Sequence, residues 1–214
     1  MNPVTTPDPA TVFVVEDDPS VRKALTRLFL AAGMHTVSCA DGEEFFALHD
    51  PDVPGCLVLD LQLPGMDGAQ VQQRLAAAGT VRPIVFLTGH ADVDTSVRVM
   101  RAGAVNLLTK PATEAQLLGA VEEVVALDRA ARQTRHAESA DRERLQTLTP
   151  RERAVFDLVI QGMANKCIAV ELDIVEKTVK VHRGRVMHKM GVRSIARLVQ
   201  LADRLGLGNA TSPQ

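Results

Sequence analysis

The sequence contains no Trp and no Tyr, and six Phe make up its 3% of aromatic residues. Its hydrophobic cores must therefore be built largely from aliphatic side chains. A hydrophobic content of 46% with 23% charged residues is typical of a globular chain and excludes wholesale disorder. At 214 residues the chain is longer than one average domain, so two modest domains are expected.

Cysteines and long apolar segments are scarce. The three cysteines, Cys39, Cys56 and Cys167, are far apart in apolar runs. An odd number at such spacing gives little support to a disulfide framework or a zinc site, so we expect reduced thiols in the cores. No apolar stretch is long enough to cross a bilayer, and the first residues lack a basic segment leading into an apolar one. These absences predict a cytoplasmic protein with no membrane partner.

The formal net charge of −2 conceals a division of charge along the chain. Residues 1–128 contain 8 Lys and Arg against 17 Asp and Glu, whereas residues 149–214 contain 11 against 6. Residues 129–148, between them, contain 5 against 3. This asymmetry predicts two functions on one chain, and the basic part is expected to face a polyanion.

In the first half, short apolar runs alternate with segments of helical period. Such runs predict buried strands, and the amphipathic segments between them predict helices. Five strand–helix units predict a doubly wound, five-stranded parallel sheet of the α/β class. Ligands of such sheets bind beyond the carboxyl ends of the strands. The predicted strands are residues 11–15, 35–39, 56–60, 83–87 and 105–109.

The second half is helical in pattern. Residues 128–146 have no large aliphatic residue before Leu145, which predicts a solvated and helical linker. Thr149-Pro150-Arg151-Glu152 combines a capping Thr, a Pro at the first helical position and a Glu at the third, which indicates a helix start. Four short helices from there predict a small all-α domain with a helix-turn-helix unit. We therefore expect domains at 1–127 and 147–208, a linker at 128–146 and a disordered tail at 209–214.

Reactive side chains stand at the carboxyl ends of the predicted strands: Glu16 and Asp17 at the first, Asp60 at the third, Thr88 at the fourth and Lys110 at the fifth. Carboxylates that converge there would repel one another unless a cation bound them, and hard oxygen ligands suit Mg²⁺. A carboxylate beside Mg²⁺ can act as a nucleophile toward a phosphoryl group, while a lysine offsets the charge of the oxygens. A single Asp at a strand end is usually a cap, the role that we assign to Asp18 and Asp67.

Motifs around these residues resemble the receiver domain of two-component response regulators over about residues 10–125. The motifs are Val14-Val15-Glu16-Asp17-Asp18, Leu59–Gly68, Leu87-Thr88-Gly89-His90 and Thr109-Lys110-Pro111. The resemblance implies that a sensor histidine kinase phosphorylates Asp60, and that Thr88 and Lys110 contact the phosphoryl oxygens. It also implies that the chain has no enzymatic activity beyond the hydrolysis of its own aspartyl phosphate. It also implies that Mg²⁺ or Mn²⁺ is bound by Glu16, Asp17, Asp60 and the backbone carbonyl of Gln62.

Two positions depart from the receiver pattern. Receivers usually carry Tyr or Phe where this chain has Leu107, and often Phe where it has Ala112. Because the aromatic residue normally swings inward as the Thr moves, we expect activation to depend on Thr88 and on repacking near the fifth strand. Leu107 is expected to respond to this change more weakly than the usual aromatic residue would.

The predicted helix at residues 176–190 has one basic face. Val179, Val186 and Met190 form its inner stripe at helical spacing. A basic face on the second helix of a tight pair fits the DNA major groove. The outer stripe consists of Lys177, Lys180, Val181, Gly184 and His188, flanked by Arg185 and Lys189.

Residues Leu148–Arg153, Gly162–Lys166 and Thr178–His182 resemble the LuxR-type helix-turn-helix. With the receiver ahead of it, the chain is similar to transcriptional regulators of the FixJ/NarL family, and most similar to the FixJ/StyR branch. Many relatives have a capping Ser where this chain has Val175. The resemblance implies base-edge contacts from Lys180 and Val181, and contacts nearer the phosphates from Lys177, Thr178, His182 and Arg185.

The resulting hypothesis is a response-regulator transcription factor. One helix-turn-helix binds one half-site, so phosphorylation is expected to promote homodimerisation, promoter binding and contact with RNA polymerase. An aspartyl-phosphate phosphohydrolase is the first alternative, but it needs a second carboxylate where Gln62 stands. A DNA-binding protein with a vestigial receiver is the second, and the presence of all five acceptor-site residues disfavours it.

Overall fold

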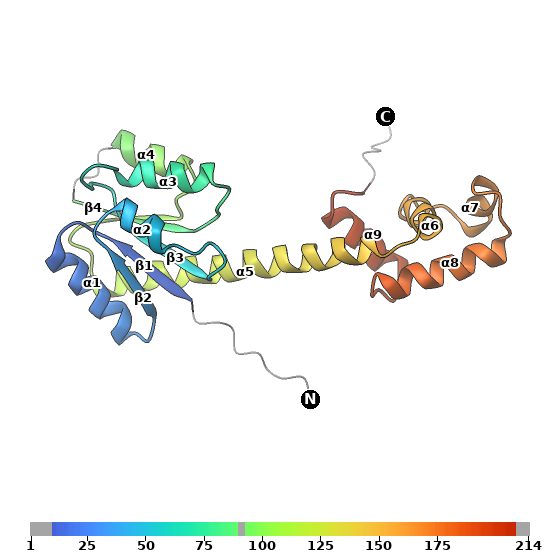
Figure 1. Cartoon of the computed structure of the whole chain (residues 1–214), viewed down its shortest axis with the longest axis horizontal. Helices are drawn as coiled ribbons and strands as arrows, with labels where there is room; N and C mark the ends of the chain where they lie inside the picture. Colours follow the sequence, from blue (N-terminus) through green and yellow to red (C-terminus); the bar gives the residue numbers. More distant parts are fainter. Residues whose placement is uncertain (1–9, 90–92, 209–214) are drawn as a thin grey trace. The chain divides into compact units, whose positions relative to one another are not determined.

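The computed structural model describes residues 10–89 and 93–208, and the predicted tail at 209–214 lies outside them. The chain divides into two compact units, Met1–Arg132 and Gln133–Gln214. Figure 1 shows a unit of strands and helices followed along the chain by a purely helical one. Within the described ranges, no helix is both long and apolar enough to span a membrane.

Five parallel strands form a single sheet in the first unit, in the order β2-β1-β3-β4-β5. This is the strand order of flavodoxin-like doubly wound folds, and it confirms the predicted α/β class. Alternate residues of β1 enter different cores, because successive side chains of a strand point to opposite faces. The strands are β1 (Thr11–Val15), β2 (His35–Cys39), β3 (Gly55–Asp60), β4 (Ile84–Thr88) and β5 (Asn106–Thr109).

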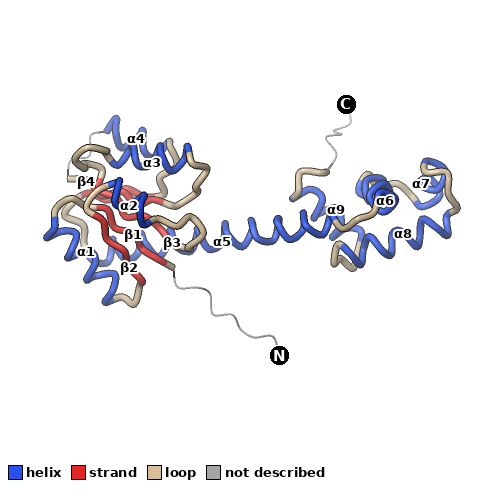
Figure 2. Tube along the Cα trace, viewed as in Figure 1, coloured by secondary structure: helices blue, strands red, loops and turns tan. Residues whose placement is uncertain are grey.

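Helices cover both faces of this sheet (Figure 2). Phe13 and Val15 of β1 belong to the core under α2, α3 and α4, whereas Val12 and Val14 belong to the core under α1 and α5. With both faces covered, the carboxyl edge of the sheet remains as the place for polar chemistry. The helices are α1 (Pro19–Ala31), α2 (Gly42–Leu48), α3 (Gly68–Ala77), α4 (Val93–Arg101) and α5 (Glu114–Gln146).

Helix α5 continues through the residues predicted to be a linker. The expectation that this segment is solvated is wrong at particular residues: Asp128 and Asp141 are buried, and Leu145 packs against the core of the second unit. These polar residues are buried because arginines neutralise their carboxylates, which an apolar periodicity cannot reveal. The two units meet along the chain at Arg132. The expected domain boundaries at 127 and 147 remain predictions.

The second unit is a small helical domain around one apolar core that includes Phe156, Ile168, Val186 and Leu198. The predicted start at Thr149 is confirmed: the Thr149 hydroxyl accepts the Glu152 N–H, and the Glu152 carboxylate accepts the Thr149 N–H. The helices are α6 (Pro150–Ile160), α7 (Asn165–Glu171), α8 (Glu176–Lys189) and α9 (Ile195–Arg204).

The cysteines are free thiols. Cys39 and Cys56 are buried as expected, and burial raises the pKa of both thiols to about 12. Cys167 is exposed on α7, so its assignment to a core was wrong. The buried position of that helical turn is taken by its neighbour Ile168.

Candidate functional site

An acidic cluster lies at the carboxyl edge of the sheet. Carboxylate oxygens of Glu16, Asp17 and Asp60 lie within 4.8 Å of one another. Glu16 and Asp60 are only 1% and 6% exposed, whereas Asp17 is open to solvent. The register explains this convergence, because β1 and β3 are adjacent and Val15 pairs with Leu59 immediately before the acidic residues.

Lys110 bridges the two buried carboxylates. Its ammonium donates to Glu16 Oε2 and to Asp60 Oδ2, each at 2.6 Å. Burial raises the pKa of Glu16, and the nearby charge of Asp60 acts in the same direction. Burial opposes the charge on Lys110, but its hydrogen bonds to Asp60 and Glu16 outweigh that cost and raise its pKa. Lys110 is therefore held protonated against the carboxylates.

The loop after β3 shapes the surroundings of Asp60. The backbone N–H of Gln62 donates to Asp60 Oδ1 at 3.0 Å. Helix α3 begins at Gly68, where an added Cβ would lie 2.5 Å from the carbonyl oxygen of Asp60. Asp67 caps this helix, and Asp18 caps α1, which confirms the capping roles predicted for both. The backbone N–H groups of Val21 and Ser20 lower the pKa of Asp18.

Thr88 is the last residue of β4 and is fully buried. Its backbone carbonyl accepts the N–H of Lys110 at 2.7 Å. This bond ties the ends of β4 and β5 together, so Thr88 and Lys110 belong to the same edge as the acidic cluster. The structure thus brings together all five residues that were predicted to gather there.

Arg22 belongs to this site but was not predicted. Its guanidinium, on α1, donates to the backbone carbonyls of Glu16 at 2.5 Å and of Asp17 at 3.0 Å. It thereby holds the turn that carries both acidic side chains. An Arg five residues after an acidic pair, in the first turns of the next helix, is the signal that could have identified it.

The residues of the cluster fit a divalent cation. Their donors are hard carboxylate oxygens, which Mg²⁺ prefers. Three carboxylates against the single ammonium of Lys110 leave two negative charges, which a divalent ion would balance. Of the predicted ligands, Gln62 lies in the loop that follows Asp60, and its backbone N–H donates to Asp60 Oδ1.

Helix α8 presents the predicted basic face. Its inner residues Val179, Val186 and Met190 are buried, as predicted. Val181 is 48% exposed although it is apolar, and the Lys180 side chain is 65% exposed. Of the other predicted contacts, Thr178 is partly buried. The remaining exposed residues of this face are Lys177, Gly184, Arg185 and His188.

Contacts within the second unit engage several residues of α8. Lys189 donates to the buried Glu152 at 2.6 Å and to the Thr147 carbonyl at 2.8 Å. The hydrogen bond from Lys189 lowers the pKa of Glu152 to about 2. Arg183 donates to the Asn165 side chain of α7. His182 is partly buried, and its Nδ1 has no hydrogen-bond partner among the described residues.

Comparisons with known proteins agree with this division of the molecule. Residues 12–122 match the family of response regulator receiver domains, and residues 146–202 match the luxR family of bacterial regulatory proteins. Nodulation protein W of Bradyrhizobium diazoefficiens is 43% identical over 92% of this chain and 87% of its own. FixJ of Rhizobium meliloti is 38% identical over 92% of this chain and 97% of its own. The solved response regulator StyR is 44% identical, with a TM-score of 0.82, and the match covers 91% of this chain and 98% of StyR.

The chain is a response regulator of the two-component family. It combines a receiver domain with a LuxR-type DNA-binding domain, as do transcriptional regulators of the FixJ type. Full-length FixJ of B. japonicum is a second solved relative, 34% identical with a TM-score of 0.57 over 94% of this chain and 98% of its own. This identification confirms the predicted fold class and function.

The two departures from the receiver pattern have visible consequences in this response regulator. Leu107 pairs with Phe86 of β4 and packs, partly buried, against the core beneath α2, α3 and α4. Ala112 lines an apolar cavity of about 520 Å³ between α1 and α5, together with Leu25 and Leu117. Lys110 and Pro111 also line this cavity.

Proposed function

We propose that this response regulator accepts a phosphoryl group on Asp60 from a sensor histidine kinase. The observation that carries the proposal is the Lys110 ammonium, which bridges Asp60 and Glu16 at the mouth of the acidic cluster. In the reaction, an Asp60 oxygen attacks phosphorus, the bond from phosphorus to the donor breaks, and the donor keeps that electron pair. Lys110 and the Thr88 hydroxyl then contact the phosphoryl oxygens.

Glu16, Asp17, Asp60 and the Gln62 carbonyl would hold Mg²⁺, or Mn²⁺, at this site. The ion supplies charge neutralisation at the phosphoryl oxygens when bound. The protein residues do the remaining work: Arg22 holds the turn of the acidic pair, and the Gln62 N–H orients Asp60. The Lys110 ammonium offsets the repulsion between Glu16 and Asp60.

Asp60→Asn tests the acceptor. With radiolabelled acetyl phosphate and Mg²⁺, the wild-type chain should become labelled as acetate leaves, and the variant should not. Asp67→Asn is the matched control, because it changes a carboxylate of the same loop but keeps a capping oxygen for α3. Labelling of Asp60→Asn at the wild-type rate would show that another residue is the acceptor.

We propose that α8 enters the major groove of promoter DNA. Lys180 and Val181 would meet base edges, while Lys177, Thr178, His182 and Arg185 would lie nearer the phosphates. Lys189 was predicted as a further contact. Two of its three donors already serve Glu152 and Thr147, so we assign it mainly to the stability of the domain.

Lys180→Ala tests this DNA interface. A duplex is first selected from a random-sequence pool with the wild-type chain in beryllofluoride and Mg²⁺. The variant should bind this duplex about tenfold to a hundredfold more weakly, because a base contact by Lys is worth roughly 1–3 kcal/mol. Arg151→Ala removes an exposed positive charge from α6 and serves as the control. Equal loss in both variants would indicate a general charge effect and count against the assigned role of Lys180.

We further propose a phosphoacceptor without enzymatic turnover beyond self-dephosphorylation. A phosphohydrolase would need an acid two residues after the nucleophile, and Gln62 at that position contacts Asp60 through its backbone. We place this regulator in the cytoplasm, where promoter DNA and RNA polymerase are its partners. Phosphorylated copies would pair to occupy two half-sites.

A further inference from the structure

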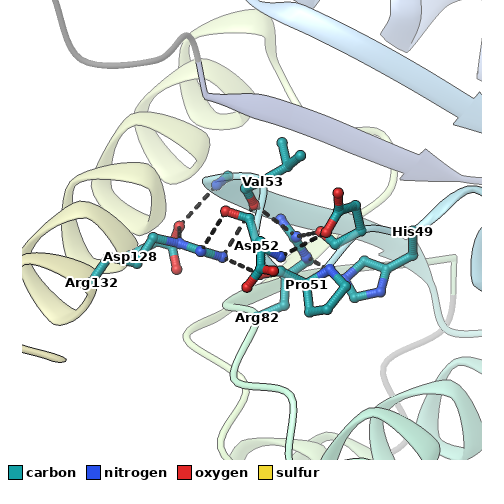
Figure 3. A network of polar contacts seen from close by, with 9 residues as sticks. His49, Pro51, Asp52, Val53, Arg82, Asp128 and Arg132 are labelled. Carbon is teal, nitrogen blue, oxygen red and sulfur yellow. Dashed lines mark hydrogen bonds and ion pairs between the residues drawn. The ribbon is translucent and has the colours of Figure 1, made fainter. Parts of the chain in front are cut away.

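A second polar cluster lies at the amino-terminal edge of the sheet, opposite the acidic site. Figure 3 shows it between α5 and the loop that joins α2 to β3. Arg132 of α5 donates to the carbonyls of Pro51 at 2.8 Å, Asp52 at 2.9 Å and Val53 at 3.1 Å. One guanidinium thus binds three successive carbonyls of a loop about 80 residues away in the sequence.

Arg82, two residues before the start of β4, binds the same loop from another side. It is 5% exposed and donates to the carbonyls of Asp50 at 2.8 Å and Val53 at 2.9 Å. Its Nε donates to His49, and its guanidinium lies over the ring of Phe13. Together the two arginines bind every carbonyl from residue 50 to residue 53. We call this arrangement the arginine clamp: Arg82, Arg132 and loop residues 50–53.

Asp128 supplies the carboxylate that pairs with the arginine clamp. Its Oδ2 accepts from Arg132 Nε at 2.7 Å and from the backbone N–H of Gly55 at 2.8 Å, and Asp128 is 1% exposed. Burial lowers the pKa of Arg82, and the neighbouring charge of Arg132 lowers it further. The buried guanidinium of Arg82 and the partly buried one of Arg132 thus lie near one buried carboxylate. Arg82 Nη1 is buried without a hydrogen-bond partner among the described residues, so the loss of further bonds would leave still more of a buried charge unpaired, which is costly.

The clamp meets the strands that carry the acceptor site. Gly55, which Asp128 binds, is the first residue of β3, and Asp60 is the last. Arg82 and Pro83 lead into β4, which ends at Thr88. Gly55 lies close against β1, because its φ is +148° and an added Cβ would lie 1.9 Å from the Thr11 carbonyl oxygen. A shift of either strand at the acceptor edge therefore reaches the clamp about 16 Å away along the strand.

The far part of α5 belongs to the second unit. Asp141, buried on the same helix, binds Arg204 of α9 at 2.9 Å and Arg144 at 3.0 Å. Helix α5 is unbroken between Arg132 and Asp141. One helix is thus bound by ionic contacts to the receiver domain at one point and to the DNA-binding domain at another.

We propose that Asp128 and Arg132 are positioning residues that couple the acceptor site to the DNA-binding domain. A conformational change at Asp60 and Thr88 shifts β3 and β4, which end at these residues. The shift alters the arginine clamp, and the clamp sets the stability of α5 beyond Arg132. The proposal rests on the proposed function, because it takes Asp60 as the acceptor. Without the clamp, α5 would remain folded within each unit but would no longer respond to the acceptor site.

Hydrogen–deuterium exchange of the full-length chain, with and without beryllofluoride and Mg²⁺, tests this coupling. In the wild type, beryllofluoride should change exchange both around residues 55–68 and in residues 133–146, the latter by about fivefold or more. In Arg132→Gln the change around 55–68 should persist, and the change in 133–146 should fall to less than twofold. Asp128→Asn should behave in the same way, because its amide keeps an acceptor for Gly55 but cannot balance Arg132.

Two further variants separate coupling from stability. Arg129→Gln removes an exposed charge one turn earlier on α5 and should keep the wild-type response. Arg132→Lys keeps the charge beside Asp128 but cannot span three carbonyls, so it should lose the response even if Arg132→Gln fails to fold.

The proposal would be overturned if residues 133–146 of folded Arg132→Lys or Arg132→Gln responded to beryllofluoride as they do in the wild type, since Arg132 would then only stabilise the receiver. The proposal would also be overturned if beryllofluoride changed the exchange of the wild-type chain only in residues 55–68. No response around 55–68 in the wild type would overturn the proposed acceptor and, with it, the coupling.

Discussion

The surroundings of individual side chains decide which residues of this regulator serve chemistry and which serve the fold. Lys110 and Lys189 are both lysines bound to a buried glutamate at 2.6 Å. The second partner of Lys110 is the carboxylate of Asp60, the proposed phosphoacceptor, whereas the second partner of Lys189 is the backbone carbonyl of Thr147. The sequence distinguished Lys110 by its place at a strand end, but it could not show that Lys189 turns inward, because Glu152 lies 37 residues away.

His49 makes the stability of the receiver domain dependent on pH. Its Nε2 accepts from Arg82, and burial, followed by the charge of Arg82, lowers its pKa from 6.5 to about 4. Asp50 opposes this shift and Arg132 adds to it. Between pH 6.5 and 4 the unfolded chain binds a proton that the folded chain does not, so stability falls as the pH falls through this window.

His49→Gln should remove this contribution while keeping an acceptor for Arg82. Urea unfolding followed by circular dichroism should show that the wild type loses roughly 1–2 kcal/mol more than the variant between pH 6.5 and pH 4. This is less than the full effect of such a shift, because His49 is partly exposed. His136→Gln, at an exposed position of α5, is the control. Equal losses in wild type and His49→Gln would refute the role of His49.

Helix α8, like α7, begins without a side-chain cap. Its cap residue Val175 is 67% exposed and makes no side-chain capping bond, in contrast to Ser194, which caps α9. The sequence predicted this missing cap correctly, because a cap depends on neighbouring residues. The N–H of Thr178 donates to the Val175 backbone carbonyl at 2.9 Å, and no side chain caps the N–H groups of Glu176 and Lys177.

Val175→Ser should stabilise the DNA-binding domain by about 1 kcal/mol, because a serine hydroxyl would accept an N–H of the first helical turn. Thermal unfolding followed by circular dichroism measures the gain. Val170→Ser, the same change at an 80% exposed position inside α7, should alter stability by less than about 0.5 kcal/mol. A similar gain in both variants would attribute the effect to reduced apolar exposure instead of capping.

At the scale of the whole molecule, the net charge of −2 is a cancellation between two domains with different tasks. The acidic domain concentrates carboxylates at a site that suits a divalent cation, and the basic domain carries α8, which we propose as its DNA-binding helix. One such DNA-binding domain covers a single half-site, so the function of the whole chain is expected to need two copies.

Phosphorylation should therefore change the mass of the particle. Sedimentation equilibrium with beryllofluoride and Mg²⁺ should show a dimer, whereas the chain without them should be a monomer or a weak dimer. Asp60→Asn should remain in the unphosphorylated state under both conditions. An unchanged wild-type mass after beryllofluoride has bound would contradict activation by dimerisation.

The sequence by itself determined the parallel sheet, the four helices after Thr149, the caps at Asp18, Asp67 and Thr149, and the five residues that meet at the carboxyl edge of the sheet. These features depend on local periodicity, capping chemistry and the rule that parallel strands end at one edge, all of which are written in neighbouring residues. Only the tertiary structure decided the contacts of Arg22, Arg82, Asp128 and Arg132 and the burial of Asp128 and Asp141 on α5. Charged residues of this kind look solvated in a linear pattern, and only their pairing with backbone carbonyls and carboxylates brought close by the fold allows them to be buried.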